Sequence, residues 1–191
     1  MDSSKRLDDP SNYRCTITLN PTNGAIFDTS GTYRYSLWRA WSLYHPRIAF
    51  ILLNPSTADE HNNDPTIRRC ISFARAWNFG SIEVVNLFAY RATDYRELFK
   101  ANEPIGTENN HFITGALERC STIVLGWGAR GTFLNRDRQV MALLARRNDL
   151  YCLGITKNGQ PRHPLYVKGN TNPVPIRNIF TAPGTSSQAT L

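Results

Sequence analysis

Several features that would place a chain in a common class are missing from this sequence of 191 residues. Its four cysteines are scattered, with no Cys-x-x-Cys pair, so the ligand spacing of zinc ribbons and of iron–sulfur clusters is missing. There is no Gly-rich phosphate loop. No apolar run approaches the roughly 20 residues that cross a membrane, and the polar first residues do not resemble a signal peptide. These absences favour a cytoplasmic protein with no membrane segment, metal or cofactor, whose cysteines are buried, reduced and used as small hydrophobic residues. A cluster of four distant cysteines is the alternative.

The composition is that of a soluble globular protein, with 41% hydrophobic and 19% charged residues. A chain of this length usually forms one domain with a substantial core. We expect a flexible N-terminus over residues 1–12, a single domain over 13–180 and a disordered tail over 181–191, the whole being a monomer.

The positive charge is concentrated in one part of the chain. The formal net charge is +7, and residues 126–177 hold nine Lys or Arg against two acidic residues, whereas the remainder holds thirteen of each. This segment has the charge pattern of a surface that binds a polyanion, although a basic solvated surface would look the same.

Four apolar runs predict buried strands of a parallel sheet, whose two faces are both covered. The first runs from Ile48 to Leu53 and stops abruptly at Asn54-Pro55. The others are 82–87, 122–125 and 150–155. Ahead of them, 15–20 and 25–27 flank a Pro-Thr-Asn-Gly sequence that predicts an antiparallel hairpin. Residues 33–41 fit a strand that runs into a short helix, with no clear boundary.

Helical patterns separate the four runs. Asp64 as N-cap and Pro65 as first helical residue predict a helix that continues to Trp77. Asp94 is expected to cap a short helix, Thr107 a longer one, and a fourth covers about 135–147. This alternation predicts an α/β fold, a three-layer α/β/α sandwich with a central, mostly parallel four-stranded sheet, plus the N-terminal β-hairpin.

Polar signals follow the ends of these strands, where open α/β sheets bind ligands. They are Asn54-Pro55-Ser56, Asn86, Gly126-Trp127-Gly128 and, after the fourth strand, Arg162-His163-Pro164-Leu165. Each signal alone also fits a turn or a structural side chain. If the strands are parallel, all four converge on one rim.

The order of these motifs resembles that of the uracil-DNA glycosylase superfamily. That superfamily has a strand followed by Gly-x-Asn-Pro or Gly-Gln-Asp-Pro as its first motif and a His-Pro-Ser or Asn-Pro-Ser loop as its last. The chain also resembles, over residues 33–167, a bacterial and phage family without an assigned function. The shared motifs are Leu-Asn-Pro-Ser-Thr-Ala-Asp, Asp-Pro-Thr-Ile-Arg-Arg-Cys, Asn-Leu-Phe-Ala and Arg-His-Pro-Leu-Tyr.

The glycosylase resemblance implies a monofunctional DNA glycosylase that flips out a base and hydrolyses its N-glycosidic bond, leaving an abasic site. Asn54 would position the attacking water, His163 would stabilise negative charge on the departing base, and Asn86 would read the base edge. The cleavage needs an oriented water and a donor aimed at the base, which suits these side chains. Other base-binding candidates are Ser56, Asp64, Arg68 and Phe88, with Phe73 as an alternative stacking ring.

DNA is the expected partner, because a base inside a duplex must be flipped out to reach such a site. Candidates for contacts to phosphates are Arg130, Arg136, Lys157, Arg162 and Lys168. Leu165 or Tyr166 is a candidate wedge that fills the gap left by the base. Packing within their own loop would explain these two residues equally well.

Three departures from the superfamily pattern bear on the target base. Leu53 stands where the superfamily has glycine, Ser56 replaces the Tyr or Gly that follows the proline in well-known members, and no single aromatic matches the ring that stacks on the base. In addition, extra polar groups occur in 59–69. We therefore expect a modified base with a polar substituent, as in some phage DNA, and a role in repair or antiviral defence. The alternatives are a non-catalytic nucleic-acid or modified-base binding module, a hydrolase of free nucleosides, and an additional lyase activity through Lys157.

Overall fold

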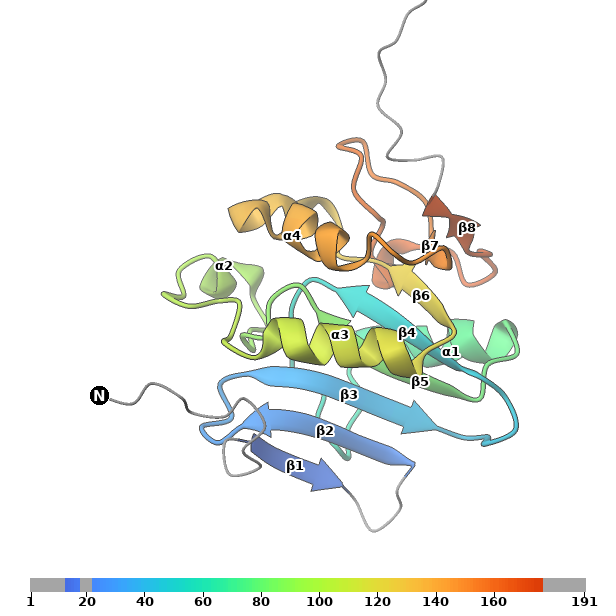
Figure 1. The fold of residues 1–191 in the computed structure, drawn as a ribbon, viewed down its shortest axis with the longest axis horizontal. Helices are drawn as coiled ribbons and strands as arrows, with labels where there is room; N and C mark the ends of the chain where they lie inside the picture. Colours follow the sequence, from blue (N-terminus) through green and yellow to red (C-terminus); the bar gives the residue numbers. More distant parts are fainter. Residues whose placement is uncertain (1–12, 18–21, 177–191) are drawn as a thin grey trace, which may run out of the picture.

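The structure, a computed structural model, describes residues 13–17 and 22–176. Both terminal segments that we expected to be flexible, 1–12 and 181–191, lie outside the described residues. In the described part, eight strands form one mixed sheet in the order β1-β2-β3-β5-β4-β6-β7-β8 (Figure 1). The strands are β1 Tyr13–Ile17, β2 Asn23–Asp28, β3 Arg34–Ala40, β4 Arg47–Leu52, β5 Ser81–Asn86, β6 Thr122–Leu125, β7 Leu150–Cys152 and β8 Val174–Pro175.

The four predicted apolar strands form the parallel part of this sheet, which confirms that part of the prediction. β4 lies at its centre and pairs in parallel with β5 and β6, and β6 pairs in parallel with β7. In β4, every residue from Ile48 to Leu52 is buried, as expected for a strand covered on both faces.

The antiparallel part of the sheet is larger than predicted. The predicted β1–β2 hairpin is confirmed, but β3 joins it to β5 in antiparallel pairing. The described sheet therefore has eight strands and is mixed, and the prediction that it is mostly parallel with four strands is wrong. Residues 34–40 form a strand with no helix, because both edges of β3 are paired. Asn23-Gly24 is not the turn: Gly24 lies in β2, opposite Ile17 and under the ring of Trp38.

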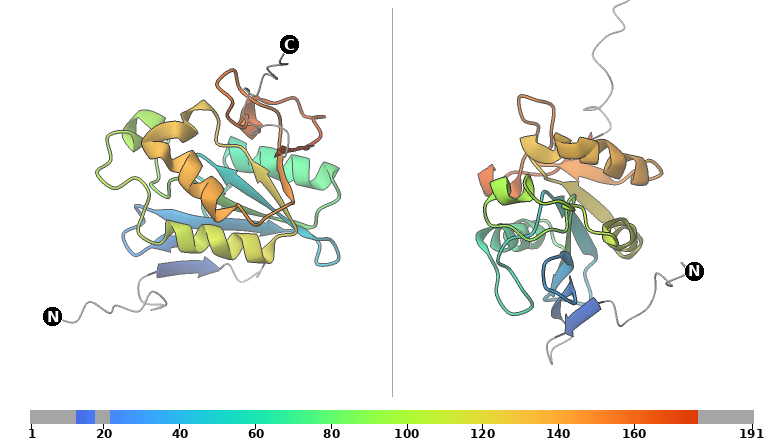
Figure 2. Two further views of the ribbon diagram at one scale, coloured as in Figure 1. Left: turned by 45° about the horizontal axis from the view of Figure 1, so that its top comes forward. Right: turned by 90° about the vertical axis from the view of Figure 1, so that its left-hand side faces the viewer.

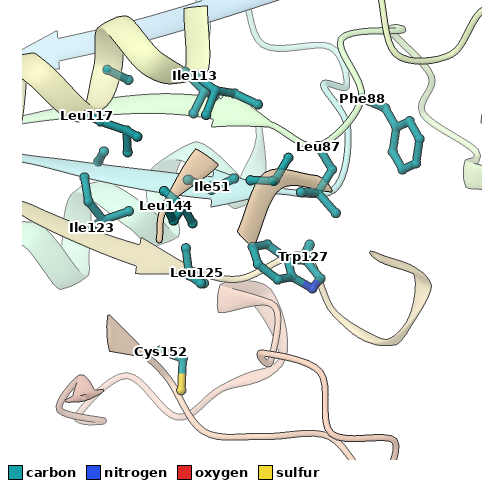
Figure 3. Packing of buried hydrophobic residues seen from close by; sticks show 14 of the residues in the cluster. Ile51, Leu87, Phe88, Ile113, Leu117, Ile123, Leu125, Trp127, Leu144 and Cys152 are labelled. Carbon is teal, nitrogen blue, oxygen red and sulfur yellow. The ribbon is translucent and has the colours of Figure 1, made fainter. Parts of the chain in front are cut away.

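Helices cover both faces of the sheet, as the three-layer prediction requires (Figure 2). On one face, α1 (Pro65–Ala76) packs on Ile48, Phe50 and Leu52 of β4. On the other face, α3 (Asn109–Arg119) and α4 (Arg136–Leu143) pack with Ile51 and its neighbours in the cluster drawn in Figure 3. Alternate residues of β4 thus serve opposite layers.

The helix starts follow the sequence in two of three cases. The Asp64 carboxylate accepts a hydrogen bond from the Ile67 backbone N–H at 2.8 Å, and Asp94 caps the short helix α2 (Tyr95–Leu98) in the same way. Thr107 is not a cap, because α3 begins at Asn109 after Glu108. The last helix, α4, ends at Leu143, earlier than predicted.

The three cysteines whose side chains are described fit the prediction for thiols. Cys70, Cys120 and Cys152 are free and buried, and burial raises the pKa of each thiol. None of the helices in the described part of the chain is long and apolar enough to cross a membrane.

The path of the chain creates a crevice where β4 and β6 end. After β4 the chain enters α1 on one face of the sheet, whereas after the neighbouring strand β6 it continues to α4 on the other face. Loops that diverge from adjacent parallel strands leave a concave surface at their carboxyl ends. The candidate site lies there.

Candidate functional site

A cavity of about 560 Å³ opens at the carboxyl ends of β4 and β6. This volume lies in the range of about 300–1,000 Å³ that is typical of small-molecule sites. Its walls come from the loops after β4, β5 and β6, the start of α1, and the loop that carries His163. The lining residues used below are Asn54, Ser56, Thr57, Asp64, Thr66, Ala92, Thr93, Tyr95, Trp127, Arg130, Arg162, His163, Leu165 and Tyr166.

Asn54 is fixed by hydrogen bonds to two backbone carbonyls. Its Nδ2 donates to the Pro55 oxygen at 3.0 Å and to the Ala92 oxygen at 2.8 Å. Because only the amide nitrogen can donate, these bonds set the orientation of the side chain. Among the described residues no donor reaches Oδ1, so this oxygen is available as an acceptor at the cavity wall.

His163 is neutral near physiological pH. Burial lowers its pKa from 6.5 to about 4, although the negative charge of Asp64 acts in the opposite direction. Its Nδ1 accepts a hydrogen bond from the Leu165 backbone N–H at 3.3 Å. The neutral ring therefore carries its proton on Nε2, which makes this nitrogen a donor.

Glycines hold the loop of His163 against the end of β6. A Cβ on Gly126 would lie 2.9 Å from the Cδ of Pro164, so only glycine allows this close approach. The Gly128 N–H donates to the Pro161 carbonyl at 2.8 Å, and the Arg162 N–H donates to the Gly154 carbonyl at 2.9 Å. The sequence signals Gly-Trp-Gly and Arg-His-Pro-Leu therefore form one structural unit.

Behind the cavity, the buried cation Arg34 supports the loop after β4. Its Nη1 donates to the carbonyl of Ala58 at 2.7 Å, and burial lowers its pKa to about 10, so it is still charged near neutral pH. Asp64, which caps α1 and lines the cavity, supports this charge electrostatically. The position of the cavity wall thus depends on β3, which the sequence did not connect to the site.

Asn86 and Phe88 were predicted to bind the base, but neither lines the cavity. The chain after β5 continues to pair with the end of β4, since the Leu87 and Phe88 N–H groups donate to Leu52 and Leu53. It reaches the cavity only at Ala92. Asn86 is 1% exposed, and its amide atoms have no partner among the described residues.

The aromatic candidates are also corrected. Phe88 is buried against Phe133, and Phe73 is stacked on Trp77 in the core beside α1. The aromatic rings that line the cavity are instead Trp127, Tyr95 and Tyr166. Of these, only Trp127 and Tyr166 belong to motifs that the sequence analysis placed near the site, Gly-Trp-Gly and His-Pro-Leu-Tyr.

Arg68 and Arg136 do not occupy the predicted positions. Arg68 is exposed, does not line the cavity, and donates to the backbone oxygen of Asn63. Arg136 is 1% exposed and its guanidinium bonds to Leu87, Gln139 and Asn110, so no phosphate can reach it. The prediction of a phosphate contact at Arg136 is therefore wrong.

The other predicted DNA-contacting residues are at the surface. Arg130 and Arg162 line the rim of the cavity and are exposed. Lys157 and Lys168 are also exposed and lie within six residues of Arg162 in the sequence, but they do not line the cavity. Leu165 and Tyr166 line the cavity with exposed fractions of 41% and 77%. This arrangement leaves both side chains free to contact a ligand.

Tyr95 is a site residue that the sequence analysis missed. The guanidinium of Arg130 lies 3.5 Å from the centre of its ring, a cation–π contact that orders the rim. Tyr95 is the first residue of α2, and only the Asp94 cap before it could have indicated its position. The ring of Trp127 is held by a hydrogen bond instead, because its Nε1 donates to the Gln160 side chain at 2.6 Å.

Comparisons place the chain in one family. No curated protein and no solved structure matches it. The model of the family described as "Protein of unknown function (DUF1643)" matches residues 34–165. This span covers most of the chain, from the start of β3 to the loop that carries His163. The chain therefore belongs to the DUF1643 family, and all the residues that line the cavity except Tyr166 lie within the matched part.

Proposed function

We propose that the protein is a monofunctional DNA glycosylase that excises a modified base from a flipped nucleotide. The observation that carries the proposal is the pairing, on one cavity, of a fixed acceptor and a neutral donor. Asn54 has its amide orientation set by two carbonyls, and His163 holds its proton on Nε2. In the motif order that resembles the uracil-DNA glycosylase superfamily, Asn54 belongs to the first motif and His163 to the last.

The reaction suits this pair of groups. The bond between the sugar C1′ and the base nitrogen breaks, and its electron pair leaves with the base. A water oxygen then bonds to C1′, and the proton lost by the water goes, overall, to the base anion. Oδ1 of Asn54 orients this water without having to deprotonate it early, and the Nε2–H of His163 stabilises the anion.

A neutral histidine is well suited to a departing anion. A protonated ring could transfer its proton, whereas the low pKa of His163 keeps it a hydrogen-bond donor without a charge. A donor fixed before the reaction costs no reorganisation as charge develops on the base.

The rim supports DNA as the source of the base. Arg130 and Arg162 place positive charge at the mouth of the cavity, where phosphates on either side of a flipped nucleotide would lie. Leu165 and Tyr166 are exposed beside them as candidate wedges. Since Asn86 is outside the cavity, recognition of the base is assigned to Ser56 and Asp64.

The test is release of a base from DNA. Purified protein is incubated with duplexes that each contain one ordinary, deaminated or hypermodified base, and abasic sites are detected by alkaline cleavage of the strand. We expect abasic sites with a modified base and none without protein. A complete lack of abasic product on every substrate, by protein that is folded and binds the duplexes, would favour the binding module instead.

A further inference from the structure

A second pocket adjoins the cavity on the side of β5 and β3. Its volume is about 390 Å³, and its lining includes Thr32, Tyr90, Arg91 and Glu97. Four residues, Ser56, Thr57, Ala92 and Thr93, line both this pocket and the cavity. The two spaces therefore adjoin along these four residues, so a substituent on a ligand in the cavity can extend past them into the second pocket.

Hydrogen bonds connect Ala92, one of the residues shared by the two spaces, to Asn54 and Pro55. The Ala92 N–H donates to the Pro55 carbonyl at 2.9 Å, and Nδ2 of Asn54 donates to the Ala92 carbonyl at 2.8 Å. These bonds join the loop after β4 to the loop after β5. A group that occupies the second pocket is thus held in a fixed relation to the acceptor oxygen of Asn54.

The second pocket is polar but carries balanced charge. The hydroxyls of Ser56, Thr57 and Thr93 make no hydrogen bond to any described residue. The charged groups of the lining are one cation, Arg91, and one carboxylate, Glu97. Arg91 is anchored by its Nη1, which donates to the Gly31 carbonyl at 2.9 Å, and Glu97 is exposed on α2.

We infer that this pocket receives a neutral, polyhydroxylated substituent, such as a sugar, attached to the excised base. Each hydroxyl of a sugar both donates and accepts, so it pairs with carboxylate, guanidinium and threonine groups together. The carboxylate of Glu97 disfavours a phosphate, and the polar lining disfavours an apolar group. The volume lies in the usual range for a bound small molecule.

This inference rests on the proposed function, which places the base itself in the cavity. The test therefore measures binding, which does not depend on catalysis. Two duplexes are compared, each with one 5-hydroxymethylcytosine on a 2′-fluoro sugar that resists cleavage, with or without glucose on the hydroxymethyl group. The fluorine destabilises the positive charge that cleavage would build on the sugar, so the wild-type protein can be used.

We expect the glucosylated duplex to bind at least about tenfold more tightly, the effect of one hydrogen bond to a charged group. Glu97→Gln should remove most of this preference and leave the affinity for the duplex without glucose unchanged. The matched control is Glu118→Gln, because Glu118 is exposed on α3 and lines neither the cavity nor the second pocket. It should bind both duplexes as the wild type does.

The outcomes separate the two claims. Equal affinities of the wild type for the two duplexes, or an equal loss on both duplexes in Glu97→Gln, overturn the inference whether or not any base is released. A preference for glucose that depends on Glu97, with no release from cleavable duplexes, supports the pocket and overturns the glycosylase activity.

Discussion

The roles that we propose for Asn54 and His163 rest on different physical features. The amide of Asn54 is oriented by hydrogen bonds to backbone carbonyls. The ring of His163 is kept neutral by burial, which lowers its pKa. Neither property is visible in the sequence, because Asn-Pro and His-Pro also occur in ordinary turns.

The pKa of His163 predicts a pH dependence of stability. The unfolded chain protonates this residue below about pH 6.5, whereas the folded protein resists protonation until about pH 4. The unfolded state thus binds more protons in this window, so the free energy of unfolding should fall as pH drops from 6.5 to 4. In His163→Gln this contribution should be absent, giving a smaller fall in Tm between those pH values.

Thermal unfolding followed by circular dichroism checks this prediction. The control is His61→Gln, because His61 is exposed on the loop before α1 and is outside the cavity lining. It should keep the pH dependence of the wild type. An identical pH dependence in His163→Gln and the wild type would show that His163 is not held neutral.

At the scale of elements, the close contact of the β6 end with the His163 loop is the feature that assembles the cavity. Gly126→Ala would add a Cβ 2.9 Å from the ring of Pro164, which is too close unless the end of β6 or the loop that carries His163 moves. We expect a loss of about 1–3 kcal/mol in unfolding free energy, typical of overpacking. Base release should fall more than stability suggests, since the displaced loop carries the donor.

Urea unfolding and single-turnover base release measure the two effects. Gly169→Ala is the control, because its added Cβ would meet only the flexible end of Arg69 at 3.2 Å. It should change neither quantity appreciably. Wild-type stability and activity in Gly126→Ala would mean that the loop does not depend on this contact.

Most elements could be predicted from local patterns. The parallel strands are continuous apolar runs, and the start of α1 has both a capping Asp and a Pro at its first position. β3 was ambiguous because its aromatic and charged residues follow neither a clean alternation nor a helical period. Its pairing on both edges is a tertiary effect, as is the burial of Arg34 and Arg39 at its ends.

The same limit explains the site residues that were wrong. Asn86 lies at the end of a strand, as Asn54 lies after one, but the chain after β5 continues to pair with the end of β4, and Asn86 is buried outside the cavity lining. Arg136 lies in the basic segment, yet its guanidinium satisfies the carbonyl of Leu87. The number of basic residues in a segment does not distinguish a buried arginine of this kind from one at the surface.

At the scale of the whole molecule, the basic residues around the cavity predict a salt-dependent affinity for DNA. Log affinity falls as log salt rises, and each phosphate contact that is lost should make this slope less steep by about 0.9. Arg130→Ala and Arg162→Ala, which change the two arginines at the rim of the cavity, should each make the slope less steep by about this amount and weaken binding to all sequences alike. Fluorescence anisotropy at several salt concentrations measures the slope.

Arg146→Ala is the control for charge alone. Arg146 is exposed and belongs to the same basic segment, but it lies just beyond α4 and does not line the cavity. Its replacement should leave the slope unchanged. If all three variants changed the slope equally, binding would depend on net charge and not on the rim of the cavity.

The central claim is that Asn54 and His163 act on one glycosidic bond, and the rate of base release by Asn54→Ala tests it most directly. Loss of the group that orients the water should slow release by at least about a hundredfold, with DNA affinity nearly unchanged. Thr66→Ala changes another lining side chain and should stay within about twofold of the wild type. Release by Asn54→Ala at the rate of the wild type, on a substrate that the wild type cleaves, would contradict the account.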